Sequence, residues 1–554
     1  MATDTTGLRT AAEAGRPPLP AAAPRKRSSA EHRRLLIILG TLMLAMFLSA
    51  LDQTIVSTAL PTIAGDLHGL NHLSWVVTSY LLASTITTPL WGKLGDLYGR
   101  KLFFQSAIVI FLIGSMLSGL SHDMLELISF RAVQGVGAGG LIVGAQAVMG
   151  DLVSPRERGR YMGVFGAVFG VSSILGPLLG GLFTQTLSWR WVFYVNIPLG
   201  IVALLVITSV LHIPKRKTQH KVDYLGTVLL GSAVTGIILL TTWGGTTYAW
   251  NSAPIWTLGL ISAGLVIAFV FLERRVTEPL MPPSLFRLRA FNLSSIVGFI
   301  IGTVMFGAMI YIPLYLQTVH GATPTSSGLQ MLPVVIGMLV AFNISGQLTS
   351  RRGRYKAFPI IGCALTTVGL FLLSTMQVTT PLLVSSTYMF VIGLGIGFVM
   401  QTIVVVVMNA APQEYLGTAT SSATFFRSIG GSFGVAVFGA IFNNRLFSEL
   451  PKYLPRAALR AMRVASGNSI ASNPRQLDAL PGPIHHGFVE AFGHSLTFVF
   501  LVGVPFAVVA FVLCWLIPEV PLRDTAFVSV GMEEAIAEGI PIPDEPAAYP
   551  ASQN

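Results

Sequence analysis

Three charged residues lie inside long apolar stretches of the sequence, where an ionised side chain loses its hydration. They are Asp52, in a run that begins at Leu35, and the arginines Arg131 and Arg427. Placing a charge in an apolar environment is costly unless a partner compensates it, and such residues often mark ion or proton pathways. Asp52 and Arg131 are therefore candidates for a proton-coupling pair. Arg427 has either a structural or gating role, or a long side chain that merely reaches the nearest aqueous interface.

The distribution of carboxylates narrows the choice of a proton carrier. Between residues 280 and 447 the sequence contains a single acid, Glu414. The acids elsewhere lie near the ends of the apolar stretches, apart from Asp52 and, less clearly, Glu126. We expect Asp52 to be the proton-carrying acid, because a carboxyl group held out of water can bind and release a proton as its surroundings change. Glu126 is the second candidate.

Asp52 and Arg131 are predicted to lie at the same depth. Asp52 precedes Pro61, near the end of its apolar stretch, and Arg131 follows His122, near the start of its own, by nine residues in each case. At the rise of an α-helix, each residue lies roughly 14 Å below the same surface. The sequence therefore predicts that the two side chains share one level, at which a contact between them is possible.

Composition indicates a membrane protein. Of the 554 residues, 52% are hydrophobic and only 11% are charged, a balance that a soluble domain of this size does not show. The net charge of +11 comes from short basic clusters between apolar stretches, which is typical of cytoplasmic loops and not of a nucleic-acid-binding face. Cys363 and Cys514 are far apart in the sequence and are expected to be buried apolar residues, not a disulfide or a metal site.

Fourteen apolar stretches are each long enough to cross a bilayer, which takes about 20 residues. They begin near residues 35, 72, 102, 122, 161, 189, 224, 254, 291, 326, 357, 381, 417 and 494. The basic connections between them alternate with connections that are nearly free of Lys and Arg, so the basic side is predicted to be the cytoplasm. We therefore expect an all-α, multi-pass protein of the cell membrane with both termini in the cytoplasm.

An internal repeat predicts two halves. The segments "GKLGDLYGR" (92–100) and "GQLTSRRGR" (346–354) share the pattern G-x-L-x-x-x-x-G-R, and Ser350 stands where the first copy has Asp96. Such duplication is typical of transporters built from two bundles with a substrate site between them. The expected parts are a disordered tail over 1–34, a six-helix bundle over 35–211, two inserted helices over 212–290, a second six-helix bundle over 291–517 and a tail over 518–554.

One long connection, residues 443–493, interrupts the second half and is expected outside the cell. Within it, residues 455–464 form either a short amphipathic helix or a solvated segment. The nearby pair His485 and His486 has no further ligand at metal-binding spacing, so no metal site is expected there.

Five motifs resemble a known family in their order and spacing. They are "LDQTIVSTALPTI" (51–63), "GKLGDLYGRK" (92–101), "RAVQGVGAGG" (131–140), "SILGPLLGG" (173–181) and "WRWVFYVNIPLG" (189–200). Together they resemble the fourteen-span drug:proton antiporter branch of the major facilitator superfamily, over roughly residues 35–517. The resemblance implies two six-helix bundles plus two inserted central helices. It also implies export of drugs, antibiotics or other small amphipathic compounds in exchange for protons, without a cofactor.

The second motif has the residue types of a cytoplasmic gate. Its candidate residues are Gly92, Asp96, Gly99, Arg100 and Lys101. Glycine permits a tight turn, and the charged members can pair with one another or with charges in residues 151–160. The resemblance implies that Asp96 latches the cytoplasmic side in one of two states. A basic anchor without a switching role is the alternative, but it does not require the acid.

The fourth motif concentrates small residues and proline within one apolar stretch. Its candidate residues are Gly176, Pro177, Gly180 and Gly181. In a membrane such residues let helices approach closely and bend, although static packing uses the same contacts. The resembling family carries this motif in antiporters and exporters, which implies export, and Ser172 stands where its pattern usually has glycine. In the fifth motif, Trp189, Trp191 and Arg190 are predicted to anchor the outer membrane interface.

Other functional classes have little support in the sequence. It contains neither a Walker-type phosphate loop nor a G-x-S-x-G elbow, so ATP-driven transport and hydrolysis are not indicated, and we expect no enzyme activity. A transporter of a specific physiological metabolite with the same fold is the alternative. An acid in the cavity would suit lipophilic cations, while neutral and anionic substrates stay open. The expected partners are a small-molecule substrate, protons and lipid, with no nucleic acid, and a functional monomer is expected.

Overall fold

The computed structural model describes residues 29–67, 73–211, 223–245, 248–322, 324–455, 482–520 and 522. In this part of the chain there is no β-strand beyond one isolated bridge between Gly244 and Tyr248, and thirteen helices are long and apolar enough to cross a membrane. The helix α2, Leu73–Tyr98, has 26 residues and supplies the length for one more crossing. The predicted all-α fold is confirmed, and its fourteen long helical segments match the number expected from the sequence.

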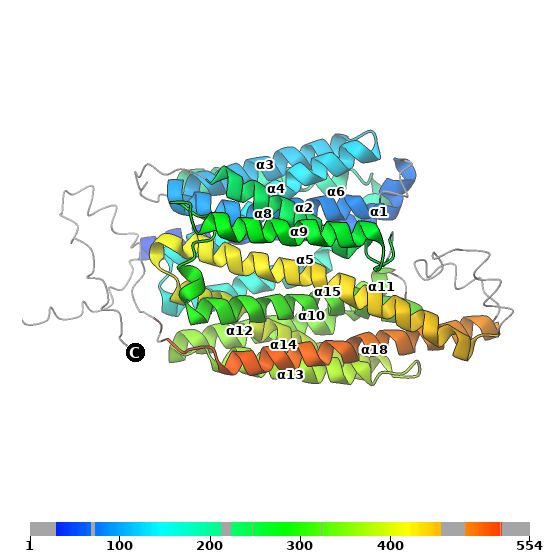
Figure 1. Ribbon diagram of the computed structural model, residues 1–554. Helices are drawn as coiled ribbons and strands as arrows, with labels where there is room; N and C mark the ends of the chain where they lie inside the picture. The colour runs from blue at the N-terminus through cyan, green and yellow to red at the C-terminus, as the bar shows by residue number, and fades with distance from the viewer. Residues whose placement is uncertain are drawn as a thin grey trace, which may run out of the picture.

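The two halves of the chain form two groups of helices (Figure 1). The first group contains α1 (Ser29–Asp66), α2, α3 (Arg100–Leu120), α4 (Met124–Leu152), α5 (Pro155–Thr186), α6 (Trp191–Tyr194) and α7 (Asn196–Val210). The second contains α10 (Arg289–Thr318), α11 (Pro324–Gln330), α12 (Leu332–Arg352), α13 (Ala357–Ser374), α14 (Leu382–Ala410), α15 (Leu416–Tyr453) and α18 (Gly482–Trp515). Short 3₁₀ turns, η2 (Leu285–Arg287) and η3 (Gln413–Tyr415), precede α10 and α15.

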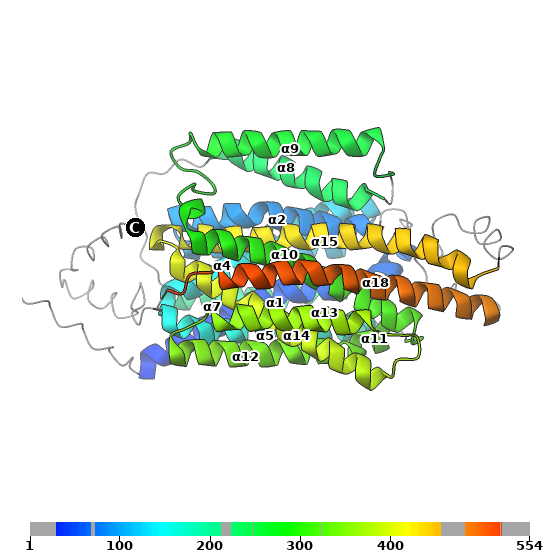
Figure 2. The ribbon, with the colours of Figure 1, turned by 60° about the horizontal axis from the view of Figure 1, so that its bottom comes forward.

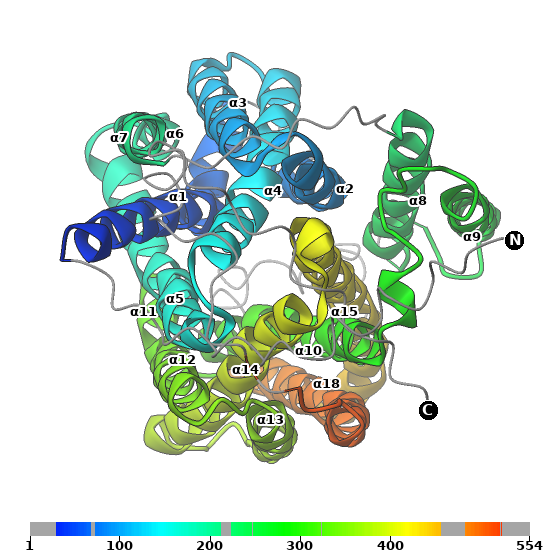
Figure 3. The same ribbon diagram turned by 90° about the vertical axis from the view of Figure 1, so that its left-hand side faces the viewer.

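The two inserted helices, α8 (Tyr224–Trp243) and α9 (Ala253–Glu273), form an antiparallel pair beside the two groups. Figure 2 shows the pair set apart from the other helices. Seen along the helix axes in Figure 3, α8 lies next to α2 of the first group and α15 of the second. The insertion therefore flanks one side of the junction between the halves.

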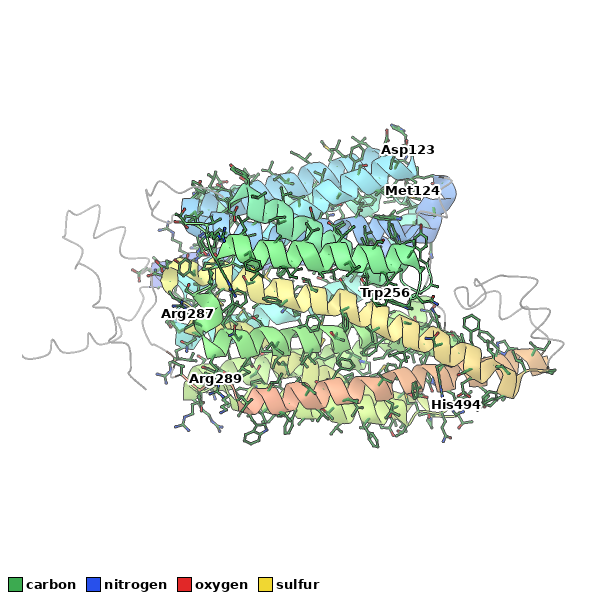
Figure 4. All side chains as sticks on the ribbon, viewed as in Figure 1. Asp123, Met124, Trp256, Arg287, Arg289 and His494 are labelled. Atoms are coloured by element: carbon green, nitrogen blue, oxygen red, sulfur yellow. The ribbon has the colours of Figure 1, made fainter. Side chains whose placement is uncertain are left out.

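The two ends of the molecule differ in charge. Figure 4 places Arg287 and Arg289 at one end, and Asp123, Met124 and His494 at the other. The first of these is called the basic end below, because the connections with clustered Lys and Arg lie there. The other is called the opposite end.

Glycines in α4 explain how three helices of the first group pack closely. A Cβ atom at Gly137 would overlap the backbone of α3 at Phe111, and one at Gly135 would overlap the backbone of α2 at Tyr80. Small residues let membrane helices approach in this way and gain dispersion contacts. The motif at 131–140 thus brings α2 and α3 against the helix that carries Arg131.

Helix boundaries differ from the predicted ones at several places. Helix α1 begins at Ser29, before the predicted Leu35, and the side chain of Arg34 donates a hydrogen bond to the carbonyl of Val210 at the end of α7 (3.1 Å). This bond satisfies a carbonyl at the end of α7 and ties the first turns of α1 to that helix. The rest of the predicted tail, residues 1–28, lies outside the described residues.

The predicted outer loop over 443–493 is partly helical. Helices α15 and α18 extend into it and protrude beyond the other helices (Figure 1). Here the ring of Tyr453 stacks on that of His494 with centroids 5.6 Å apart. Residues 456–481, which include nearly all of the segment 455–464 discussed above, lie outside the described residues. His485 and His486 are in the first turns of α18, and the described residues contain no cluster of three or more metal-binding side chains.

Two further expectations need correction. Trp189 does not face lipid, because it is buried and its ring nitrogen donates to the carboxylate of Asp66 (2.9 Å), whereas Trp191 is 47% exposed as expected of an anchor. Arg190 bonds the carbonyl of Ser121 at 3.1 Å, so it ties connections of the protein together and does not reach out to lipid headgroups. Cys363 and Cys514 are buried and free as expected, but the fold brings their sulfur atoms to 3.5 Å from each other.

Candidate functional site

Asp52 and Arg131 are in direct contact. The guanidinium of Arg131 donates to the carboxylate of Asp52 at 2.5 Å, and both side chains are almost completely buried. Helices α1 and α4 run in opposite directions and cross here. Asp52, counted back from the end of α1, and Arg131, counted forward from the start of α4, therefore lie at the same depth, as predicted from the sequence. A guanidinium in this geometry compensates the buried carboxylate by a charge-assisted hydrogen bond.

Two amides complete the shell around the acid. The side-chain nitrogens of Gln134 and Asn196 donate to Asp52 at 2.8 and 3.1 Å, and both amides are buried. From the sequence, Gln134 and Asn196 were only two polar residues within two of the motifs, and nothing indicated that they contact Asp52. Asn196 belongs to the motif interpreted as an interfacial anchor, so that interpretation missed a contact with the central acid.

The Asp52 shell does not open directly into the central cavity. The neighbouring residues Ser49 and Gln53 line the cavity, whereas the carboxylate faces α4 and α7. Tyr80 stands between them: its ring lies 4.1 Å from the guanidinium of Arg131 and its hydroxyl contacts the hydroxyl of Ser49 at 3.3 Å. A single aromatic residue thus links the buried pair to the cavity wall.

The central cavity has a volume of about 610 Å³ and lies between the two groups of helices. Its deepest lining residues include Thr88 and Thr424, and its lining continues along α2, α8, α10 and α15 towards the opposite end, to Gly245 and Asn443. The lining consists of apolar, aromatic, hydroxyl and amide side chains, and none of the described residues along it carries a charge. This volume fits a drug-sized ligand.

Hydrogen bonds between the two halves close the basic end. Asp96, at the end of α2, accepts from the backbone nitrogens of Gly417 (3.0 Å) and Thr418 (2.6 Å) and from the hydroxyl of Thr418 (2.8 Å). These donors belong to the first turn of α15. The free N–H groups and the dipole at a helix N-terminus favour a carboxylate, so this contact joins the halves by charge as well as by hydrogen bonds.

The other residues of the predicted gate surround this contact. Arg100 pairs with Asp96 at 2.8 Å and also with Asp151. Gly92 permits close approach of α2 to α15, because a Cβ there would overlap Ser421. Gly99 has a φ of 105°, a conformation that favours glycine.

Lys101 makes a different contact from its neighbours in the gate motif. Its ammonium group donates to the carbonyl of Thr208 in the same half of the molecule (2.9 Å). It therefore does not take part in the junction with α15.

A second junction joins α5 to α12 and α14 at the same end. Arg156 donates to the carbonyls of Ser350 (3.0 Å) and Arg351 (3.2 Å), and the amide of Gln401 donates to the carbonyl of Gly159 (2.6 Å). Backbone carbonyls at the end of α12 accept the arginine here.

The small-residue motif of α5 packs against α1 close to Asp52. A Cβ at Gly176 would overlap Thr54, and one at Gly180 would overlap Thr58. Pro177 lies within the helix, while Gly181 faces open space. Two of the three glycines are thus required for the approach of α1 and α5, and the third is not.

The remaining candidates lie far apart. Glu126 is in the first turn of α4 at the opposite end, where its carboxylate accepts from the backbone of His122 (2.9 Å). Arg427 lines a small separate cavity in the interior of the molecule. This disagrees with the interpretation in which its long side chain reaches the nearest aqueous interface.

Comparison with known proteins agrees with this architecture. Residues 42–435 match the family described as the Major Facilitator Superfamily. The chain belongs to this superfamily. It is therefore a multi-pass membrane transporter, and superfamily members bind small-molecule substrates.

Individual relatives include named drug transporters. An uncharacterized MFS-type transporter of Mycobacterium tuberculosis (strain ATCC 25618 / H37Rv) is 45% identical over 88% of this chain and 70% of its own length. The multidrug transporter protein MdtP of Bacillus subtilis (strain 168) is 39% identical over 81% of this chain and 83% of its own length. The predicted resemblance to the superfamily and its multidrug branch is confirmed.

A solved structure shares the fold at low sequence identity. The proton:xylose symporter XylE, bound to 6-bromo-6-deoxy-D-glucose, superposes with a TM-score of 0.56 at 15% identity. The match covers 91% of this chain and 99% of the symporter. At this identity the likeness supports the fold of the transporter alone.

Proposed function

We propose that this transporter exports small amphipathic compounds, drugs or antibiotics among them, in exchange for protons. It acts as a monomer in the cell membrane, with the basic end and both termini in the cytoplasm. The names of its relatives support drug efflux, and the positive-inside rule supports the orientation.

The observation that carries the proposal is the relation of the cavity to the closed basic end. Bonds of Asp96 and Arg156 join the halves at that end, while the 610 Å³ cavity extends from the middle of the helices towards the opposite end. In the proposed orientation this is an outward-facing state. An alternating-access transporter passes through it after releasing substrate and before taking a proton from outside.

The buried Asp52 shell supports coupling to protons. Asp52 is compensated by Arg131 in the outward-facing state, and the pair reaches the cavity wall through Tyr80. Protonation of the carboxylate would remove its charge and leave the guanidinium uncompensated, so it would change the packing of α1 and α4. Helix α1 also contacts α5 at Gly176, which provides a mechanical connection from the acid to the junction between the halves.

The test is transport by the purified protein in proteoliposomes under an imposed pH gradient. The panel consists of fluorescent cations, fluorescent anions and neutral antibiotics, each compared with liposomes that contain no protein. Substrate should move against the direction of proton flow, and collapsing the gradient with an ionophore should stop its accumulation. If the protein moves substrate at a rate that does not depend on the pH gradient, proton coupling is refuted and the protein is a facilitator, which lets substrate move down its own gradient.

A further inference from the structure

Arg427 is a cation in the interior without a partner among the described residues. It lies eleven positions after Leu416 at the start of α15, which places it roughly 16 Å along the helix, about halfway through a 30 Å hydrocarbon layer. No hydrogen bond or ion pair joins its guanidinium to any residue that the structure describes. A charge in this position calls for a compensating group.

The acids of the surrounding helices do not supply that group. The small cavity around Arg427 is bordered by α1, α4, α5, α12 and α14, of which α12 and α14 contain no acid. Asp52 is paired with Arg131, and Asp151 with Arg100. The other acids of these helices and of α15 lie near helix ends: Glu31, Asp66, Glu126, Glu157 and Glu449.

The small cavity lies beside the inner part of the large one, and on two helices its lining is closer to the basic end. On α1, Met46 of the small cavity is one turn closer to the basic end than Ser49 of the large cavity. On α4, Gln146 is one turn closer to that end than Ile142. On α15 the order is different, because Arg427 lies between Thr424 and Ser428, which both line the large cavity.

Arg427 lies on the helix that borders both cavities. Its neighbours on α15, Thr424 and Ser428, line the large cavity, while Arg427 itself lines the small one. The hydroxyl of Thr424 is buried without a hydrogen-bond partner, and so is the side-chain oxygen of Gln146. The hydroxyl of Thr424 can donate to an anionic ligand, whereas the amide oxygen of Gln146 only accepts and would need a donor.

The volumes distinguish the head of a ligand from its body. The small cavity has a volume of about 40 Å³, which leaves room for a small group such as a carboxylate but not for a drug-sized molecule. The large cavity is uncharged and mainly apolar in its lining, and it has room for the rest of a drug-sized molecule.

We propose that Arg427 binds the anionic head of the substrate, a carboxylate, sulfonate or phosphate, while the apolar body occupies the large cavity. The inference rests on the proposed export function and specifies its substrate class: amphipathic organic anions are preferred over lipophilic cations. A guanidinium binds such heads with two parallel hydrogen bonds. A cation would meet an uncompensated positive charge, since Asp52 is already paired and does not line the cavity.

Binding of a matched pair of probes tests this assignment. The probes are 11-(dansylamino)undecanoic acid and its methyl ester, which share one body and differ in head charge, and the readout is dansyl fluorescence on titration of the detergent-purified full-length protein. We expect the wild type to bind the acid at least about 10-fold more tightly than the ester, as a charge-assisted hydrogen bond predicts. Arg427→Gln should remove this preference and leave ester binding unchanged.

Two variants serve as controls. Arg427→Lys keeps the charge without the planar fork and should retain part of the preference. Arg445→Gln removes another arginine of α15, which is paired with Glu449 at 2.8 Å, and should leave the preference intact.

Several outcomes would overturn the assignment. They are failure of the wild type to bind the acid, equal affinity for acid and ester, and a preference that survives Arg427→Gln. A preference for the acid in gluconate buffer that disappears in chloride buffer would assign the site to inorganic chloride instead. The titration uses no pH gradient, so its result is independent of proton coupling: gradient-insensitive transport would refute the proposed function without removing the acid preference.

Discussion

At the scale of single residues, the central feature is an acid that the protein has surrounded with donors. Asp52 accepts from Arg131, Gln134 and Asn196, and removing one partner of a buried ion pair commonly costs about 3–5 kcal/mol because the other charge remains. Protonation of Asp52 would leave the charge of Arg131 unpaired in the same way, so the stability of the pair depends on the protonation state of the acid. Substitutions here should therefore affect coupling, and their effects on folding must be measured beside it.

Replacement of the acid should separate binding from coupling. Asp52→Asn is expected to keep measurable substrate binding and to abolish proton-driven accumulation, because no titratable carboxyl remains in the shell. Proteoliposome transport and ligand binding are measured on the same preparation, with thermal unfolding as the check on folding. The double variant Asp52→Asn/Arg131→Gln removes the unpaired charge and should lack coupling as well.

Glu126→Gln provides the comparison for that experiment, since Glu126 lies at the first turn of α4 and away from the shell. It should transport like the wild type. Wild-type pH dependence in Asp52→Asn would exclude Asp52 as the coupling acid and make Glu126 the next candidate.

Arg131→Lys should shift the pH optimum of transport. A lysine keeps the positive charge, but its point charge cannot contact Asp52 and Gln134 with the fixed geometry of the guanidinium. Initial transport rates across a pH series, at saturating substrate, measure the optimum. An unchanged profile would mean that the charge alone matters at this position.

At the scale of secondary structure elements, α5 holds contacts with both halves of the molecule. Its glycines at 176 and 180 pack on α1, and Gly159 and Gly163 pack on Gly346 and Phe342 of α12. The helix that packs on α1 near Asp52 is thus also one of the helices that meet the other half. Any tilt of α1 on protonation would be passed to the junction through these contacts.

Large side chains on one face of α5 should block this movement. Gly176→Leu and Gly180→Leu are expected to reduce transport to background, because each side chain would overlap Thr54 or Thr58. Gly181→Leu is the matched control, since its Cβ meets nothing within 4 Å, and it should transport normally. Surface biotinylation or membrane fractionation verifies insertion, and full activity in both of the first two variants would show that the close packing is dispensable.

At the scale of the whole molecule, the two halves are joined at one end and separated by a cavity on the other side. Asp96 contributes to one junction and Arg156 to the other. An ionised acceptor gives hydrogen bonds worth about 1.5–3 kcal/mol each. A few such bonds are enough to bias a two-state equilibrium by orders of magnitude.

Asp96→Asn should weaken the basic-end junction and shift the transporter towards the state that opens there. The amide keeps the shape but loses the charge that interacts with the first turn of α15 and with Arg100. Maleimide labelling of single cysteines introduced at the basic end should become faster by about tenfold or more. The control is Lys101→Gln, because the ammonium group of Lys101 bonds within its own half, and this variant should be labelled at the wild-type rate. If Asp96→Asn is labelled no faster than Lys101→Gln, Asp96 is not part of the latch.

The sequence by itself determined which segments are helices, how many there are and how deep each charged residue lies. These properties follow from local quantities, namely the length of an apolar stretch and the 1.5 Å rise per residue. The equal depth of Asp52 and Arg131 was available in this way. So was the charged character of the motif around Asp96.

Only the tertiary structure decided which way each side chain faces and what lies opposite it. Asp52 turns away from the cavity, and Asp96 meets the first turn of α15, more than three hundred residues along the chain. Arg427 lines the interior and does not reach an interface. Depth is a property of one helix, but direction depends on how that helix is rotated against its neighbours, and the rotation is set by close contacts such as those of Gly176 and Gly180.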